Sequence, residues 1–260
     1  MATGSISSEK IDLLIYGPGR PILQNGFSDQ FVLHAAETKH DLERLAAVAE
    51  KIRGIAVTYH TVHADKSALA LFPKLEIVSS FGVGYDHVDS TYAREHNIVV
   101  TNTPDVLTEE VADVAMGLLI ATLREFVKAD RYLRSGLWTT QNYPLSVGSL
   151  RDRKVGIVGM GRIGQALARR AKAFGMQVHY HNRKPVPAMI AEELGATWWD
   201  DLDQMLARMD LISLNCPATK ETHHLLSAER LARLQPHAIL INTARGELID
   251  EVALAEAVAR

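Results

Sequence analysis

Short apolar runs of strand length alternate with helical segments along most of the chain. The runs lie at residues 11–17, 31–37, 54–60, 75–82 and 97–103, and a second series comprises KVGIVGM (154–160), QVHYHN, ATWW, DLISLNC and AILINTA. Segments between them, such as HDLERLAAVAEKIR, have helical spacing and good helix formers. Alternation of this kind predicts βαβ units on parallel sheets. The expected fold is therefore α/β, with one parallel sheet for each series.

The length agrees with two domains, because 260 residues at ~150 residues per domain give about two. We place the boundary near residues 101–104 and expect domains of residues 1–101 and 102–260, each flavodoxin-like or Rossmann-like. A long helical pattern from Thr108 to Ser135 opens the second domain, and Gly136 is a plausible stop. Its middle, VADVAMGLLIATL, is apolar on nearly every face, so the body of the protein or a second subunit must cover it.

Composition narrows the classes of function. The chain has 28 Lys and Arg against 31 Asp and Glu, a formal charge of -3, and no dense basic stripe, so nucleic acid is not an expected partner. No run approaches ~18 uninterrupted apolar residues, so no membrane span is expected. The single cysteine, Cys216, cannot form an internal disulfide, which favours a cytoplasmic location. We predict no metal site.

The segment VGIVGMGRIG at residues 155–164 carries the most information. An apolar strand runs into Gly159, Gly161 and Gly164 and then into a helical segment. In a dinucleotide site the first glycine permits a tight turn, the second lets the backbone approach a pyrophosphate, and the third lets helix pack on strand. The backbone N–H groups of Arg162 and Ile163 would then face the phosphates at the helix N-terminus. Dinucleotide binding is the prediction, and a merely structural turn is the alternative.

The end of the next strand bears on the choice of cofactor. An acid that would hold the ribose hydroxyls of NAD is expected there, but His181 stands in its place and is followed by Asn182, Arg183 and Lys184. This neutral-to-basic cluster suits a 2′-phosphate, so we predict a preference for NADP(H), with NAD(H) also possible. A solvated loop with two cations is the alternative interpretation.

Several motifs together identify a family. The segments FGVGYDHVD (81–89), NTPDVLTEEVADVAMGLLI (102–120), VGIVGMGRIG, NCPATKETHHLL (215–226) and AILINTARGELIDEVAL (238–254) resemble those of the D-isomer-specific 2-hydroxyacid dehydrogenases. Within this family the chain is most similar to the glyoxylate and hydroxypyruvate reductase branch. The resemblance covers essentially the whole chain and implies a flavodoxin-like substrate-binding domain followed by a Rossmann dinucleotide-binding domain.

The resemblance also implies roles for individual residues. Val83 and Gly84 would present backbone N–H groups to the substrate carboxylate, and Arg245 would be the catalytic arginine that binds the carboxylate and polarises the ketone. Residues implied at the cofactor, besides those already named, are Thr108, Cys216, Pro217, Thr222, Thr243 and Ala244. For Cys216 a structural role is at least as plausible as chemistry, because no histidine or aspartate stands beside it.

The family pattern continues past Arg245 with an aspartate, a glutamate and a proton-donating histidine, all of which would lie beyond Arg260. The dinucleotide domain is therefore expected to be incomplete at its C-terminal end. Either the chain is part of a longer enzyme or it is a natural short form that binds cofactor without completing proton transfer. We expect residues 1–260 alone to bind cofactor weakly and to turn over no substrate, because a positioned acid contributes ~10² to 10⁴ to the rate.

The leading functional hypothesis is an oxidoreductase that transfers hydride from NADPH to a small 2-keto acid, of the glyoxylate or hydroxypyruvate type, to give the D-2-hydroxy acid. The alternative is a cofactor-sensing, catalytically silent interaction protein of the same fold, since fold alone does not separate the two. The apolar pattern at 108–135 and the family resemblance both predict a homodimer.

Overall fold

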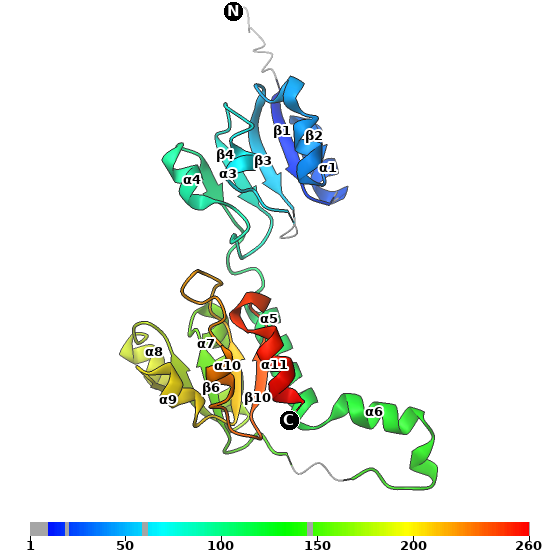
Figure 1. The fold of residues 1–260 in the computed structure, drawn as a ribbon, viewed down its shortest axis with the longest axis vertical. Coiled ribbons are helices and arrows are strands. Elements are labelled where there is room, and N and C mark those ends of the chain that lie inside the picture. Colours follow the sequence, from blue (N-terminus) through cyan, green and yellow to red (C-terminus); the bar gives the residue numbers. More distant parts are fainter. Residues whose placement is uncertain (1–9, 19–20, 59–61, 145–147, 260) are drawn as a thin grey trace, which may run out of the picture. The chain divides into compact units, whose positions relative to one another are not determined.

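The computed structural model describes residues 10–18, 21–58, 62–144 and 148–259. Contacts between residues divide the chain into two compact units, Met1–Val106 and Leu107–Arg260, called unit 1 and unit 2 below. Figure 1 labels most of their helices and strands. Among the described residues, no helix has the length and apolar character needed to cross a bilayer.

Unit 1 is built on a five-stranded parallel sheet. The strands are β1 (Ile11–Tyr16), β2 (Phe31–Ala36), β3 (Ile52–Val57), β4 (Ile77–Ser80) and β5 (Val99–Thr101), with helices α1 (Pro21–Phe27), α2 (Lys39–Glu43), α3 (Lys66–Leu69) and α4 (Ser90–Glu95). The spatial order β2-β1-β3-β4-β5 is that of flavodoxin-like folds. All five predicted runs form strands, although the run predicted at 54–60 forms β3 at 52–57, and residues 59 and 60 lie outside the described residues.

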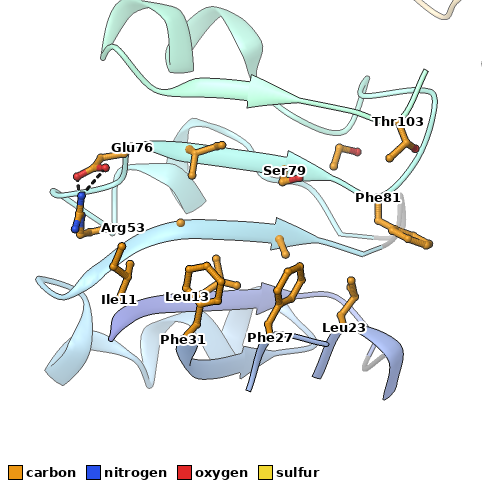
Figure 2. Close-up of a pocket in the computed structure, with 14 residues that line it drawn as sticks. Ile11, Leu13, Leu23, Phe27, Phe31, Arg53, Glu76, Ser79, Phe81 and Thr103 are labelled. Carbon is orange, nitrogen blue, oxygen red and sulfur yellow. Dashed lines mark hydrogen bonds and ion pairs between the residues drawn. The ribbon is translucent and has the colours of Figure 1, made fainter. Parts of the chain in front are cut away.

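The two faces of this sheet differ. Alternate side chains, among them Leu14, Ile55 and Val78, form a buried core with α2, α3 and α4. On the opposite face, Leu13 and Ile77 line a largely apolar pocket of about 340 Å³ beside Phe27 of α1. Figure 2 shows the Arg53–Glu76 ion pair at one end of this pocket and Phe81 and Thr103 at the other. Helices therefore cover one face of the sheet more fully than the other.

Unit 2 contains a second five-stranded parallel sheet. Its strands are β6 (Lys154–Val158), β7 (Gln177–His181), β8 (Ala196–Trp198), β9 (Leu211–Leu214) and β10 (Ile239–Asn242). The main helices are α5 (Thr108–Leu123), α6 (Phe126–Arg134), α7 (Arg162–Ala173), α8 (Ala188–Leu194), α9 (Leu202–Leu206), α10 (Ala228–Leu231) and α11 (Glu251–Val258). The order β10-β9-β6-β7-β8 is the Rossmann order, with the reversal between β6 and β9.

Both faces of the unit 2 sheet are buried. Apolar side chains of α5 and α7, such as Leu119 and Leu167, pack on one face, and side chains of α9 and α11, such as Met205 and Ala253, pack on the other. This is the arrangement that all-parallel sheets require. It also places the loops that follow β6, β7, β9 and β10 at a single edge of the sheet, because these strands are parallel neighbours.

The helix predicted from Thr108 to Ser135 is two helices, so the single-helix prediction is wrong. Glu125 adopts a left-handed conformation, with φ of 53°, between α5 and α6. Its carboxylate accepts hydrogen bonds from the Tyr143 hydroxyl (2.9 Å) and from Lys128 Nζ (3.1 Å). The predicted stop is present, since Gly136 follows α6 with φ of 77°. The residues at the break, Arg124 and Glu125, are neither glycine nor proline. No local feature of the sequence therefore indicates that the helix is interrupted here.

Unit 1 ends at Val106, close to the boundary predicted near residues 101–104. The segment after β5 stays with unit 1 because it is hydrogen-bonded to the loop after β4. The Thr103 N–H donates to the Gly82 carbonyl at 2.9 Å, and Asn102 Nδ2 donates to the Val83 carbonyl at 2.8 Å.

Candidate functional site

The β6–α7 turn places its three glycines in different surroundings. Gly159 has φ of 101°, and a side chain there would bring Cβ to 2.7 Å from the backbone nitrogen of Cys216. A Cβ on Gly164 would overlap the carbonyl oxygen of Gly159, so helix and turn can pack only with glycine at this position. At Gly161 no heavy atom lies within 4 Å of the Cβ position. The middle glycine therefore faces open space, as a phosphate approach requires.

Helix α7 begins at Arg162 with Gly161 as its N-cap, and no side chain caps it. The first N–H groups of a helix point outward at its N-terminus, and here they include those of Arg162 and Ile163. With the positive end of the helix dipole, they make this terminus a ready anion site.

The segment after β7 is tied to the glycine turn. Asn182 Oδ1 accepts the Met160 N–H at 2.7 Å. His181 donates from Nδ1 to the Trp199 carbonyl at 2.9 Å. Arg183 and Lys184 are exposed. The end of strand β7 and the residues after it thus carry hydrogen-bond donors and positive charges, with no acidic residue at 181–184.

Arg183 also acts electrostatically on the loop after β9. The pKa of Glu221 in that loop is lowered, first by a hydrogen bond from the Thr219 side chain and further by the positive charges of Arg183 and Lys220. The Arg183 side chain is therefore within electrostatic reach of this loop, and the two cationic residues 183 and 184 stand at the same edge of the sheet as the glycine turn.

The loop after β9 is compact. The Thr222 hydroxyl donates to the Pro217 carbonyl and accepts the Thr219 N–H, each at 2.7 Å. Burial raises the pKa of the Cys216 thiol, which keeps it protonated near neutral pH and argues against a nucleophilic role. Asn215 Oδ1 is buried without a hydrogen-bond partner among the described residues. Sequence reasoning missed Asn215, although an amide that directly follows a fully buried strand is a signal that could have found it.

The turn after β10 carries Arg245. Asn242 brackets this turn, because its Oδ1 accepts the Ala244 N–H at 3.0 Å and its Nδ2 donates to the Arg245 carbonyl at 2.7 Å. Arg245 is half-buried, and its Nη1 donates to the Ala244 carbonyl at 2.9 Å. Thr243 Oγ1 is buried, again without a hydrogen-bond partner among the described residues. Asn242 was not among the predicted site residues.

Apart from Thr108, the predicted site residues fall into two groups. One group gathers at the edge of the unit 2 sheet: Gly159, Gly161, Arg162, Ile163, Gly164, Asn182, Arg183, Lys184, Cys216, Pro217, Thr222, Thr243, Ala244 and Arg245. The other, Val83 and Gly84, belongs to the turn after β4 in unit 1. Thr108 is the first residue of α5, which packs on α7 and β10. Among the described residues, no hydrogen bond links Thr108 to the unit 2 group.

Known proteins resemble the chain over most of its length. Residues 116–260 match the family model described as "D-isomer specific 2-hydroxyacid dehydrogenase, NAD binding domain". A glyoxylate reductase of Thermococcus onnurineus is 41% identical over 248 residues, which are 92% of this chain and 73% of that protein. A hydroxyphenylpyruvate reductase of Plectranthus scutellarioides is 37% identical over 96% of this chain and 78% of its own length.

A solved structure agrees with these matches. The NADPH-dependent glyoxylate/hydroxypyruvate reductase of Sinorhizobium meliloti, in complex with NADP and malonate, superposes with a TM-score of 0.88 at 40% identity. The superposition covers 96% of this chain and 76% of that one. Fold, strand order and sequence therefore agree on a single family.

Proposed function

The chain belongs to the D-isomer-specific 2-hydroxyacid dehydrogenase family, and from that premise we propose that it reduces a small 2-keto acid to the D-2-hydroxy acid with NADPH. Glyoxylate and hydroxypyruvate are the proposed substrates, in line with the relatives' names. The observation that carries the proposal is the glycine turn of unit 2, with an open approach at Gly161 beside an uncapped helix N-terminus.

The residues at the edge of the unit 2 sheet fit a dinucleotide. The open space at Gly161 and the N–H groups that begin α7 suit the pyrophosphate. The buried Asn215 Oδ1 and Thr243 Oγ1 lack protein partners among the described residues, and buried polar atoms of this kind call for a ligand or water. When bound, the nicotinamide would supply the hydride.

The preference for NADP(H) rests on the end of β7. Residues 181–184 include no carboxylate that would repel a 2′-phosphate, and Arg183 can donate charge-assisted hydrogen bonds to it while Asn182 Nδ2 adds a neutral one. One charged hydrogen bond is worth ~1.5 to 3 kcal/mol, and exposure favours the lower value. Arg183→Ala should therefore raise the NADPH dissociation constant about tenfold and leave that of NADH nearly unchanged. Lys172→Ala, which removes an exposed cation in the last turn of α7, is the matched control. Equal losses for both cofactors would exclude a 2′-phosphate contact.

Arg245 is the proposed electrostatic catalyst. Its planar guanidinium can bind the substrate carboxylate and stabilise the negative charge that develops on the ketone oxygen. Asn242 holds the backbone on both sides of the turn that carries it. Val83 and Gly84 of unit 1 are proposed to bind the substrate carboxylate through their backbone N–H groups.

The test is NADPH oxidation by glyoxylate and by hydroxypyruvate, followed at 340 nm in the full-length protein. Arg245→Ala should lower kcat/KM by ~10² or more, the scale of one lost charge-stabilising donor. Arg245→Lys keeps the charge but not the planar fork, and it should recover only part of the loss. Near-normal turnover by Arg245→Ala would reject the role of this residue. Tight NADPH binding with no turnover of any 2-keto acid by the unmodified protein would instead favour a cofactor-sensing function.

A homodimer is proposed from uncovered apolar surface in unit 2. Figure 1 shows α6 extending away from the sheet of its unit. Phe126, Val127 and Leu133 on α6 are 56%, 60% and 57% exposed, and Trp138 just after it is 55% exposed. Apolar patches of this kind mark interfaces. Light scattering should give the mass of a dimer, and Phe126→Glu with Leu133→Glu should give a monomer, whereas Met189→Glu on α8 should not. A monomer at micromolar concentration in the unmodified protein would reject the proposal.

A cytoplasmic location is also proposed, because the single cysteine cannot form an internal disulfide.

A further inference from the structure

Two consecutive peptide groups in the turn after β4 are held by the segment that follows β5. The Gly82 carbonyl accepts the Thr103 N–H at 2.9 Å, and the Val83 carbonyl accepts Asn102 Nδ2 at 2.8 Å. Earlier in the same turn, the Gly82 N–H donates to the Ser80 carbonyl at 3.0 Å. The turn is therefore fixed through three successive backbone groups, two of which are held by residues about twenty positions further along the chain.

The planarity of the peptide bond means that these contacts also fix the directions of the Val83 and Gly84 N–H groups. The described chain has no cis peptide bonds, and in a planar trans peptide the C=O and the following N–H point in opposite directions. The Val83 N–H therefore points away from Thr103, and the Gly84 N–H points away from Asn102. Among the described residues, neither of these N–H groups donates a hydrogen bond within the protein. Two adjacent donors are thus aimed to the same side of the segment 102–103 without protein partners.

We propose that Asn102 is a positioning residue for the substrate carboxylate, through the Val83–Gly84 peptide. This inference rests on the proposed function, in which Val83 and Gly84 bind the carboxylate. No helix begins at this turn, since α4 starts only at Ser90, so no helix dipole orients its N–H groups. The side-chain amide of Asn102 supplies the orientation that a helix N-terminus supplies in unit 2.

Two substitutions separate positioning from a general effect on the fold. Asn102→Ala removes the donor to the Val83 carbonyl and should weaken carboxylate binding about tenfold, the scale of one well-directed hydrogen bond to a charged group. Asn102→Asp keeps the shape but replaces the donor by a second acceptor, which repels the Val83 carbonyl. In Asn102→Asp, binding should improve as the pH falls from 8 to 5, because a protonated carboxyl can again donate to the Val83 carbonyl. A purely structural role would not produce this pH-dependent recovery.

The experiment is calorimetric titration of the full-length protein, saturated with NADP⁺, with oxalate, together with KM and kcat for glyoxylate. The dissociation constant of oxalate and KM should rise by the same factor in Asn102→Ala, while the dissociation constant of NADP⁺ stays within about twofold. Asn25→Ala, which removes an exposed amide on α1 of the same unit, is the matched control and should match the unmodified protein.

Failure of this inference and failure of the proposed function give different results. Unchanged oxalate binding in both Asn102 variants, or no oxalate binding by the unmodified protein, would overturn the inference. Oxalate binding that depends on Asn102, in a protein that reduces neither keto acid, would support the inference and reject the proposed reductase function. If Asn102→Ala fails to fold, the pH dependence of Asn102→Asp decides, and the absence of recovery at low pH would overturn the proposal.

Discussion

The β6–α7 turn of unit 2 and the turn after β4 in unit 1 both present backbone N–H groups at the end of a parallel strand, but they are held in different ways. The β6–α7 turn is fixed by close packing that only glycine, which has no side chain, allows. Gly159 and Gly164 leave no room for a Cβ, and Gly161 leaves space for a ligand. The second is fixed by what a distant segment supplies, namely the side chain of Asn102 and the N–H of Thr103.

The difference shows that one kind of turn can be specified locally and another only through tertiary contacts. In unit 2, three positions within six residues determine the geometry. In unit 1, a side chain that is 19 positions away from Val83 holds the turn. We therefore expect substitutions in the first turn to act through sterics and those in the second to act through hydrogen bonding.

The largest effect is expected from Gly164→Ala. Alanine in a helix is favoured over glycine by roughly 1 kcal/mol, but the new Cβ would overlap a backbone oxygen of the turn, and such overpacking costs ~1 to 3 kcal/mol or more. Because a backbone atom cannot rotate away, the steric cost should exceed the helix gain. Urea unfolding should show a lower free energy of unfolding, and NADP⁺ binding should be lost.

Gly117→Ala is the control, since α5 has open space at that position. It should be neutral or stabilising by up to ~1 kcal/mol. If Gly164→Ala also stabilised the protein, the close packing of α7 on its turn would be contradicted.

A smaller and more selective effect is expected from Gly161→Ala. This position has φ of -79° and nothing within 4 Å of its Cβ position, so the free energy of unfolding should change by no more than ~0.5 kcal/mol. The methyl group would occupy the phosphate approach, and the NADP⁺ dissociation constant should rise about tenfold or more. Gly82→Ala in the other turn, whose Cβ would make only an ordinary contact at 3.6 Å, should leave NADP⁺ binding unchanged. Equal effects of both substitutions on NADP⁺ would remove the distinction between the two turns.

The smallest effect concerns the thiol of Cys216, a residue whose backbone packs on Gly159 of the glycine turn. Burial raises the pKa of Cys216 above its usual value, so the thiolate that reacts with iodoacetamide is scarce near neutral pH. The alkylation rate, followed by mass spectrometry, should keep rising at pH values where the rate for N-acetylcysteine has levelled off. A plateau at or below that of the free thiol would mean that the loop after β9 is open rather than packed on Gly159.

The same contrast explains which features the sequence could predict. Both strand series and the glycine turn follow from periodicity and from conformations that only glycine adopts, and these signals are local. The break at Glu125 depends on Tyr143, 18 positions away, and the role of Asn102 depends on the Val83 carbonyl, 19 positions away. The residue types at these positions do not indicate which distant group each side chain will contact.

The most direct test of the proposed function is the configuration of the product that the full-length protein forms from hydroxypyruvate and NADPH. Chiral chromatography should identify D-glycerate, formed in equal amount to the NADPH oxidised, and Arg245→Ala should form it at least ~10² times more slowly. Formation of L-glycerate, or no reduction under conditions in which NADPH is bound, would contradict the account.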